Sequence, residues 1–167
     1  MSSLDIPRRA ALLGLVALAG CGFVPAYAPG GAGTALSGRV VVAAPESVLD
    51  YRARVRLEQR LGAPQAGAPF ALDLATQSRA VAAAVAADGV QTRLNLVGQA
   101  SWRLTEPASG RLLGQGQVDA FAGFAATGST VATRTAQADA EQRLGVMLAD
   151  LVMTALLALP PASLSAP

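Results

Sequence analysis

The sequence predicts an α+β domain, a two-layer sandwich with two helices on one face of a small, mostly antiparallel four-stranded sheet, in the order β-α-β-β-β-α. Two stretches, 46–61 and 134–159, repeat apolar residues at the spacing of an amphipathic helix. Two others, 70–79 and 92–105, alternate apolar and polar residues as half-buried strands do. Turn residues separate the later strands, so we expect these strands to pair antiparallel.

The first strand and the first helix follow each other directly. Gly38–Ala44 contains three consecutive valines, which favour a strand. Pro45 suits the first turn of a helix, and we expect that helix to continue to Leu61 and to end at Gly62. Its predicted core-facing residues recur every fourth position: Leu49, Ala53, Leu57 and Leu61.

Three arginines of this helix, Arg52, Arg56 and Arg60, form a like-charged ladder. Each i, i+4 repulsion costs a few tenths of a kcal/mol. We interpret the ladder as a solvated face whose repulsion is relieved by the pairs Asp50–Arg54 and Arg54–Glu58. The alternative is a ridge that meets an anionic partner.

The second strand begins at Phe70 and is expected to continue past Arg79. The alanine-rich stretch 80–87 is ambiguous, because alanine favours a helix. The following Asp88-Gly89 pair is a strong hairpin signal and favours the extended alternative.

The third strand, 92–105, has the clearest two-sided pattern. One side is apolar and is expected to face the helices, and the other is polar and is expected to face outward. The apolar set is Leu94, Leu96, Ala100, Trp102 and Leu104, and the polar set is Arg93, Asn95, Gln99, Ser101 and Arg103.

A turn at 107–110 leads to a fourth strand, 111–121, in which Gly114 and Gly116 are interpreted as places of close approach within the sheet. We expect a polar loop of a length typical of functional loops over 123–133. The last helix is then expected from about Arg134 to Leu159, ending before two prolines.

The N-terminal 20 residues resemble a secretory signal peptide, with Arg8 and Arg9 ahead of an uncharged apolar run. Leu-Ala-Gly-Cys at 18–21 is typical of a lipobox, so we expect cleavage before Cys21, a diacylglycerol on its sulfur and an acyl chain on its new amine. Gly22, rather than aspartate, indicates sorting to the outer membrane. The expected organisation is a signal peptide (1–20), a lipidated flexible tether (21–36), one domain (37–159) and a disordered tail (160–167).

The composition excludes several function classes. The chain has no histidine and no lysine, which removes imidazole-based catalysis, imidazole metal ligands and Schiff-base chemistry. The formal net charge is only +2, which gives no support to nucleic-acid binding. We therefore expect no enzyme, no metal and no cofactor beyond the lipid. The enzymatic alternative is a carboxylate-based hydrolase using Asp73, Asp88 or Asp119.

Several segments together resemble the LPS-assembly lipoproteins of the LptE family, in particular their alphaproteobacterial branch. The resemblance rests on the mature start at Cys21-Gly22-Phe23 with Pro25 and Tyr27, on Thr92–Leu96 and Trp102–Thr105, and on Ala126–Thr133 followed by Asp139–Leu144. It implies a non-enzymatic role as the plug of an outer-membrane β-barrel LPS translocon of the LptD type. There the lipoprotein would assist barrel assembly and the insertion of lipopolysaccharide into the outer leaflet, lipid-anchored on the periplasmic side.

Arginine binds phosphate through bidentate, charge-assisted hydrogen bonds, so outward-facing strand arginines are our candidates for lipopolysaccharide contact. These are Arg79, Arg93 and Arg103. Ordinary solvated arginines are the alternative for each. Two different roles also fit a small lipid-anchored domain of this kind: an auxiliary lipoprotein of a phospholipid or ABC-type transport system, and a purely structural envelope lipoprotein.

Overall fold

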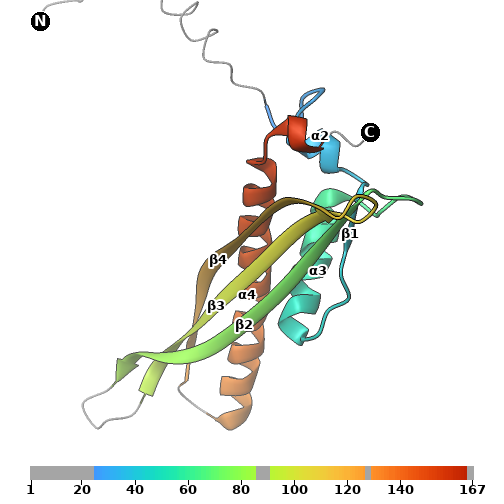
Figure 1. Cartoon of the computed structure of the whole chain (residues 1–167). Coiled ribbons are helices and arrows are strands. Elements are labelled where there is room, and N and C mark those ends of the chain that lie inside the picture. The colour runs from blue at the N-terminus through green and yellow to red at the C-terminus, as the bar shows by residue number, and fades with distance from the viewer. Residues whose placement is uncertain (1–24, 86–90, 127–128, 165–167) are drawn as a thin grey trace, which may run out of the picture.

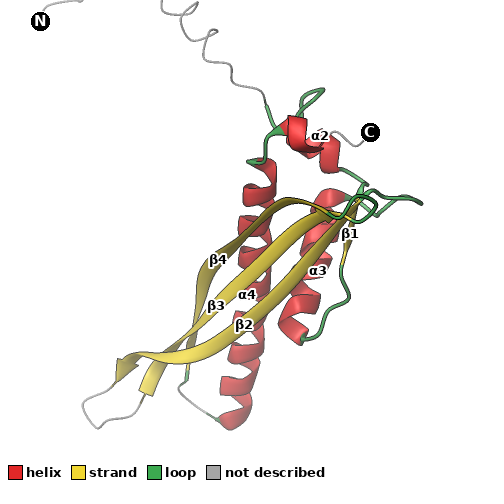
Figure 2. Cartoon of the chain, in the orientation of Figure 1, coloured by secondary structure: helices red, strands yellow, loops and turns green. Residues whose placement is uncertain are grey.

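The computed structural model describes residues 25–85, 91–126 and 129–164. A single sheet contains β1 (Val40–Val42), β2 (Phe70–Val85), β3 (Gln91–Glu106) and β4 (Arg111–Ala125), in that spatial order. Strand β1 is parallel to β2, and the other neighbours are antiparallel. The helices α3 (Val48–Leu61) and α4 (Thr130–Leu157) lie on one face (Figures 1 and 2). The predicted α+β fold is confirmed.

The core lies between the two long helices and the apolar face of the sheet. Leu104 of β3, Leu57 of α3 and Leu148 of α4 have no measurable solvent exposure. The predicted apolar side of β3 does face the helices, with Leu94 half-buried and the other four residues buried. Burial of this face fixes the pairing register, since a one-residue slip would turn all these side chains toward solvent.

Helix α3 begins later than Pro45, because Ser47 is its N-cap. The Ser47 hydroxyl accepts a hydrogen bond from Asp50 N, and the Asp50 carboxylate accepts one from Ser47 N, which together form a capping box. The carboxylate also accepts hydrogen bonds of 2.7 Å from the backbone N and from the Oγ1 of Thr76. Asp50 therefore joins the start of α3 to the middle of β2 rather than pairing with Arg54.

The Asp50 carboxyl makes folding stability depend on pH. Burial raises its pKa, but the hydrogen bonds from Thr76 and Ser47 together lower it by more. The pKa of Asp50 therefore lies below the ordinary value of 3.8. A lowered folded-state pKa contributes stability above the unfolded pKa, and this contribution is lost as the pH falls through the folded pKa. We expect Asp50→Asn to be less stable than the wild type at about pH 6, with a smaller difference at about pH 3. Urea unfolding of both chains at the two pH values measures this, and a difference that does not change with pH would contradict it.

The prediction of a solvated arginine ladder was wrong. Arg56 binds both carboxylate oxygens of Asp150 on α4, at 3.0 and 3.1 Å, and Arg60 donates to the same carboxylate at 3.0 Å. Arg52 donates to the carbonyl of Ala138 at 2.8 Å. The ladder thus faces α4, where Arg56 and Arg60 share the Asp150 carboxylate. This carboxylate offsets the repulsion between the two arginines. The predicted Arg54–Glu58 pair is confirmed at 2.7 Å.

The sheet and the last helix are longer than predicted. Strand β2 continues to Val85, which confirms the extended alternative for most of 80–87. Strand β4 continues to Ala125, and α4 begins at Thr130 after the N-cap Ser129. The expected long loop at 123–133 was therefore wrong, because strand and helix occupy most of it.

Both ends of the domain pack further than the sequence predicted. Helix α2 (Ala32–Leu36) lies in the segment expected to be a tether, and Leu36 is fully buried. A 3-10 helix, η1 (Pro161–Leu164), lies in the segment expected to be disordered, and Leu164 is also fully buried. The domain therefore includes residues 32–36 and 161–164. The predicted signal peptide, Cys21 and the Asp88-Gly89 turn lie outside the described residues.

Candidate functional site: the open face of the sheet

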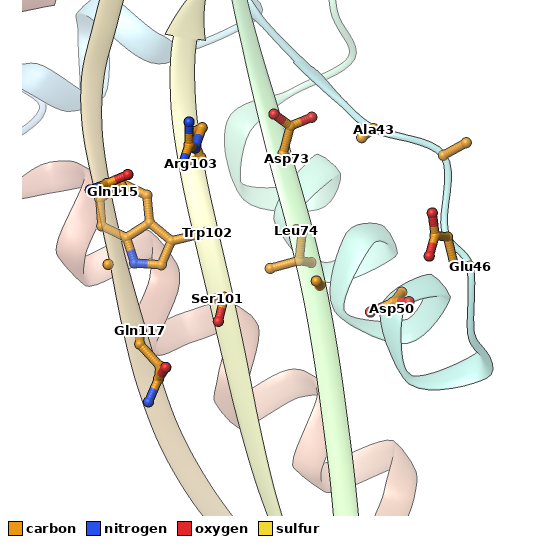
Figure 3. Close-up of a pocket in the computed structure, with 13 residues that line it drawn as sticks. Ala43, Glu46, Asp50, Asp73, Leu74, Ser101, Trp102, Arg103, Gln115 and Gln117 are labelled. Atoms are coloured by element: carbon orange, nitrogen blue, oxygen red, sulfur yellow. The ribbon is translucent and has the colours of Figure 1, made fainter.

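The sheet face opposite the helices is the candidate site. It is formed by alternate residues of β2, β3 and β4, which the register places in cross-strand rows. Successive rows are Asp73–Arg103–Gln115, Ala75–Ser101–Gln117, Gln77–Gln99–Asp119, Arg79–Val97–Phe121, and Val81–Asn95–Gly123, and Arg93 lies opposite Ala125 beyond them. No helix in the described ranges covers this face, which Figure 3 shows from its open side.

Hydrogen-bonded polar side chains occupy the middle row of this face. Gln77 Nε2 donates to Gln99 Oε1 at 2.7 Å, and Gln99 Nε2 donates to Asp119 Oδ1 at 3.0 Å. This chain of hydrogen bonds crosses all three long strands and keeps their exposed amides oriented. Such an arrangement leaves further donors and acceptors for a polar ligand or for water.

Two hollows, both lined by described residues, lie on this face. The larger, of about 650 Å³, covers the first two rows and extends past the edge of β2 to the segment 43–46, which precedes α3 (Figure 3). The smaller, of about 280 Å³, covers parts of the rows that contain Gln77 and Arg79. Both hollows are open, so they suit an extended surface contact better than an enclosed small molecule.

The structure places Arg79, Arg93 and Arg103 on this one face, and all three side chains are exposed. None of them has an ion pair or a side-chain hydrogen bond with any described residue. Most other described arginines do have such partners: Arg52, Arg54, Arg56, Arg60, Arg111 and Arg143 form ion pairs. The open face therefore carries cations whose hydrogen-bonding groups are not used within the described part of the domain.

These cations are spread along the sheet. Arg103 and Arg93 are ten residues apart on β3, which corresponds to about 33 Å at a rise of ~3.3 Å per residue. Arg79 lies between them, in the row of Val97. One phosphate cannot contact all three guanidinium groups, so the spacing suits a large ligand with separated anionic groups.

An apolar patch lies beside Arg79. Phe121 is 64% exposed in the same row, and Val97 stands between them. The predicted fourth strand ended at Phe121, and no face was predicted for this side chain. Phe121 is two residues after Asp119, and this spacing indicates that both side chains lie on the same face of the strand. An exposed aromatic ring in the same row as an exposed cation suits an amphiphile, which has apolar and anionic parts.

The carboxylates proposed for the hydrolase alternative do not form a pair. Asp73 and Asp119 lie on the same face but two rows and two strands apart. Their α-carbons are therefore separated by at least ~13 Å, compared with about 5–9.5 Å between the paired carboxyl groups of glycoside hydrolases. Asp88 lies outside the described residues. Within those residues, no group of histidine, cysteine or acidic side chains is arranged to hold a metal ion.

The glycines of β4 allow the close approach that the sequence predicted. A β-carbon at Gly116 would lie 3.1 Å from Trp102 Nε1, and one at Gly114 would lie 2.7 Å from Leu159 Cδ2. The indole thus packs flat against β4 on the helix side. Its Nε1 is buried and has no hydrogen-bond partner among the described residues.

None of the helices in the described ranges combines the length and the apolar character that crossing a membrane requires. No family model matches the sequence. No curated protein matches it either.

Solved structures share the fold. A putative lipoprotein from Caulobacter crescentus CB15 is 22% identical over 75% of this chain and 92% of that chain, with a TM-score of 0.63. Rare lipoprotein B from Shewanella oneidensis is 11% identical over 70% and 90%, with a TM-score of 0.53. An uncharacterized lipoprotein B from Nitrosomonas europaea is 14% identical over 71% and 79%, with a TM-score of 0.51. This chain therefore has the fold of these bacterial lipoproteins.

Proposed function

We propose that this chain is an outer-membrane lipoprotein that forms the plug of a lipopolysaccharide translocon barrel of the LptD type. In this role it would assist barrel assembly and the insertion of lipopolysaccharide. The observation that carries the proposal is the open sheet face, with its three exposed arginines, hydrogen-bonded amides and exposed Phe121. The likeness to rare lipoprotein B supports it at the level of the fold.

A domain inside a wet barrel needs a polar surface without strong net charge, and the open face meets that need. It combines glutamines, serine and small residues with separated arginines and with two carboxylates, Asp73 and Asp119. Lipopolysaccharide carries phosphates, sugars and acyl chains. Arginine, amide and aromatic side chains are the groups expected to contact these three parts, in that order.

The position of α2 indicates which end of the domain the expected lipid anchor would hold. Helix α2 lies at one end of the domain, and β2 ends at the other (Figure 1). Tyr27 packs against Gly33 of α2, since a β-carbon on Gly33 would lie 2.7 Å from the Tyr27 ring. Tyr27 is six positions after Cys21, which corresponds to a reach of at most about 22 Å. A lipid on Cys21 would therefore hold the α2 end close to the membrane.

Affinity purification of the tagged, lipidated chain from outer membranes in mild detergent tests the proposal. We expect one large β-barrel protein in a stoichiometric amount. A photoreactive side chain at Gln117 of the open face is expected to crosslink to that barrel. Cys21→Ser, which cannot be lipidated, is the control and is expected to lose acyl labelling. Recovery of an ABC transporter without a barrel would contradict the plug role and favour the phospholipid-transport alternative.

A further inference from the structure

The free edge of β2 is a second surface, and it adjoins the open face, on which the Arg79 side chain lies. Strand β1 pairs only with Phe70–Leu72, and the Ala43 N–H then donates to the Leu72 carbonyl. Beyond this point the chain leaves the sheet toward α3. Strand β2 continues to Val85, with no strand beside it on this side within the described residues (Figure 2).

The direction of the backbone groups follows from the observed hydrogen bonds. Phe70 N donates to the Arg39 carbonyl on the β1 side, and Thr76 N donates to Asp50 on the same side. Alternate residues of a strand point their N–H and C=O groups to the same side. The corresponding groups of Ser78, Ala80 and Ala82 therefore point toward the free edge.

Sequence features that usually protect an edge are scarce here. All six side chains from Ser78 to Ala83 are exposed, and all but Arg79 are small or apolar. The segment has no proline, and the register shifts begin only after Ala82. An unprotected edge of this length is a template for pairing with another strand.

The neighbouring surface of α3 is apolar and exposed. Tyr51 is 58% exposed and Val48 is 64% exposed. Arg60, which binds Asp150 of α4, is nine residues after Tyr51, and at about 100° per residue the two side chains point in opposite directions. Tyr51 therefore faces away from α4, on the exposed side of α3.

We infer that residues 77–82 of β2 bind an extended strand of a separate protein by backbone pairing, and that this strand carries a carboxylate beside Arg79. Charge complementarity supports this occupant, because Arg79 is the sole charge in this segment and has no partner among the described residues.

A second copy of this chain is a poorer occupant. Antiparallel pairing of two β2 edges centred on Ala80 would align the outward-pointing N–H and C=O groups of both chains. It would also place the two Arg79 side chains at diagonal positions, with α-carbons about 7–8 Å apart. Like charges at that distance repel, and residues 77–82 offer no carboxylate to neutralise them.

The test is Ala80→Pro in the full lipidated chain. Proline removes an N–H that points away from β3 toward the free edge and blocks strand pairing at that point. The matched control is Ala80→Val, because it changes the same exposed side chain but keeps the backbone N–H. We expect Ala80→Pro to retain at least tenfold less partner protein than the wild type, and Ala80→Val to retain a normal amount. Both variants should keep the thermal unfolding midpoint within a few degrees of the wild type.

Two further measurements identify the mode of contact. Amide hydrogen exchange at 77–82 is expected to slow in the purified complex and to stay fast in Ala80→Pro. A photoreactive side chain at Ser78 is expected to crosslink to an extended partner segment that contains an acidic residue. Unchanged exchange, normal partner retention by Ala80→Pro, or crosslinks to a second copy of this chain would each overturn the inference. Lipopolysaccharide binding tests the proposed function separately, because Ala80→Pro leaves Arg79, Arg93 and Arg103 in place.

Discussion

Leu144→Ala is expected to lower the free energy of unfolding by about 2–5 kcal/mol, the range for removing a fully buried leucine side chain. Leu144 lies on the sheet-facing side of α4 and has no solvent exposure. It packs directly on Gly98 of β3, where an added β-carbon would lie 2.7 Å from Leu144 Cδ2. The site cannot collapse fully, because sheet and helix are both rigid elements. Urea denaturation at neutral pH measures the loss.

Leu151→Ala is the matched control, since Leu151 is on the same helix but 41% exposed. We expect it to cost about 1 kcal/mol or less. Gly98→Ala alone should also destabilise, by about 1–3 kcal/mol, because it overpacks the same contact. Combined with Leu144→Ala, its cost should fall, since the added methyl fills part of the cavity. Additive effects of the two substitutions would show that Gly98 and Leu144 do not pack as described.

Simultaneous replacement of Arg79, Arg93 and Arg103 by glutamine is expected to weaken lipopolysaccharide binding at least about tenfold, equivalent to ~1.4 kcal/mol. Each guanidinium is exposed and has no partner among the described residues, so its hydrogen bonds are available for phosphate. Folding stability should change little, because none of these arginines pairs with a described residue. Binding of labelled lipopolysaccharide to the lipidated chain, at fixed ionic strength, measures the effect.

The control for this triple variant removes three arginines from the helices: Arg54, Arg134 and Arg143. The change in net charge is the same, so a general electrostatic attraction would weaken equally in both variants. We expect the helix variant to bind lipopolysaccharide almost as the wild type does. Equal losses in the two variants would mean that the open face is not the binding site.

The sequence alone was sufficient for the parts of the fold that rest on local periodicity. The alternation of 92–105 predicted which side of β3 is buried, because side chains of a strand alternate between faces. The same alternation placed Arg93 and Arg103 outward. The spacing of Leu49, Ala53, Leu57 and Leu61 predicted the buried side of α3 in the same way.

The alanine-rich end of β2 shows where local preference is insufficient. Alanine favours a helix, but the register pairs Arg79–Ala82 with Leu94–Val97 and extends the strand. Its hydrogen bonds come from β3, a contact outside the segment itself. Likewise, α2 and η1 are too short to be stable alone, and they form because Leu36 and Leu164 are buried in the domain.

Charge pairing between distant residues was decided only by the tertiary structure. The sequence correctly predicted Arg54–Glu58, since residues four apart on a helix are neighbours. It missed Arg56–Asp150, whose residues are 94 positions apart and meet only when α3 packs against α4. The sequence thus determined the faces of each element. The packing of those elements decided which of the described arginines form ion pairs and which stay exposed on the open face, because ion pairs depend on distance in space and not along the chain.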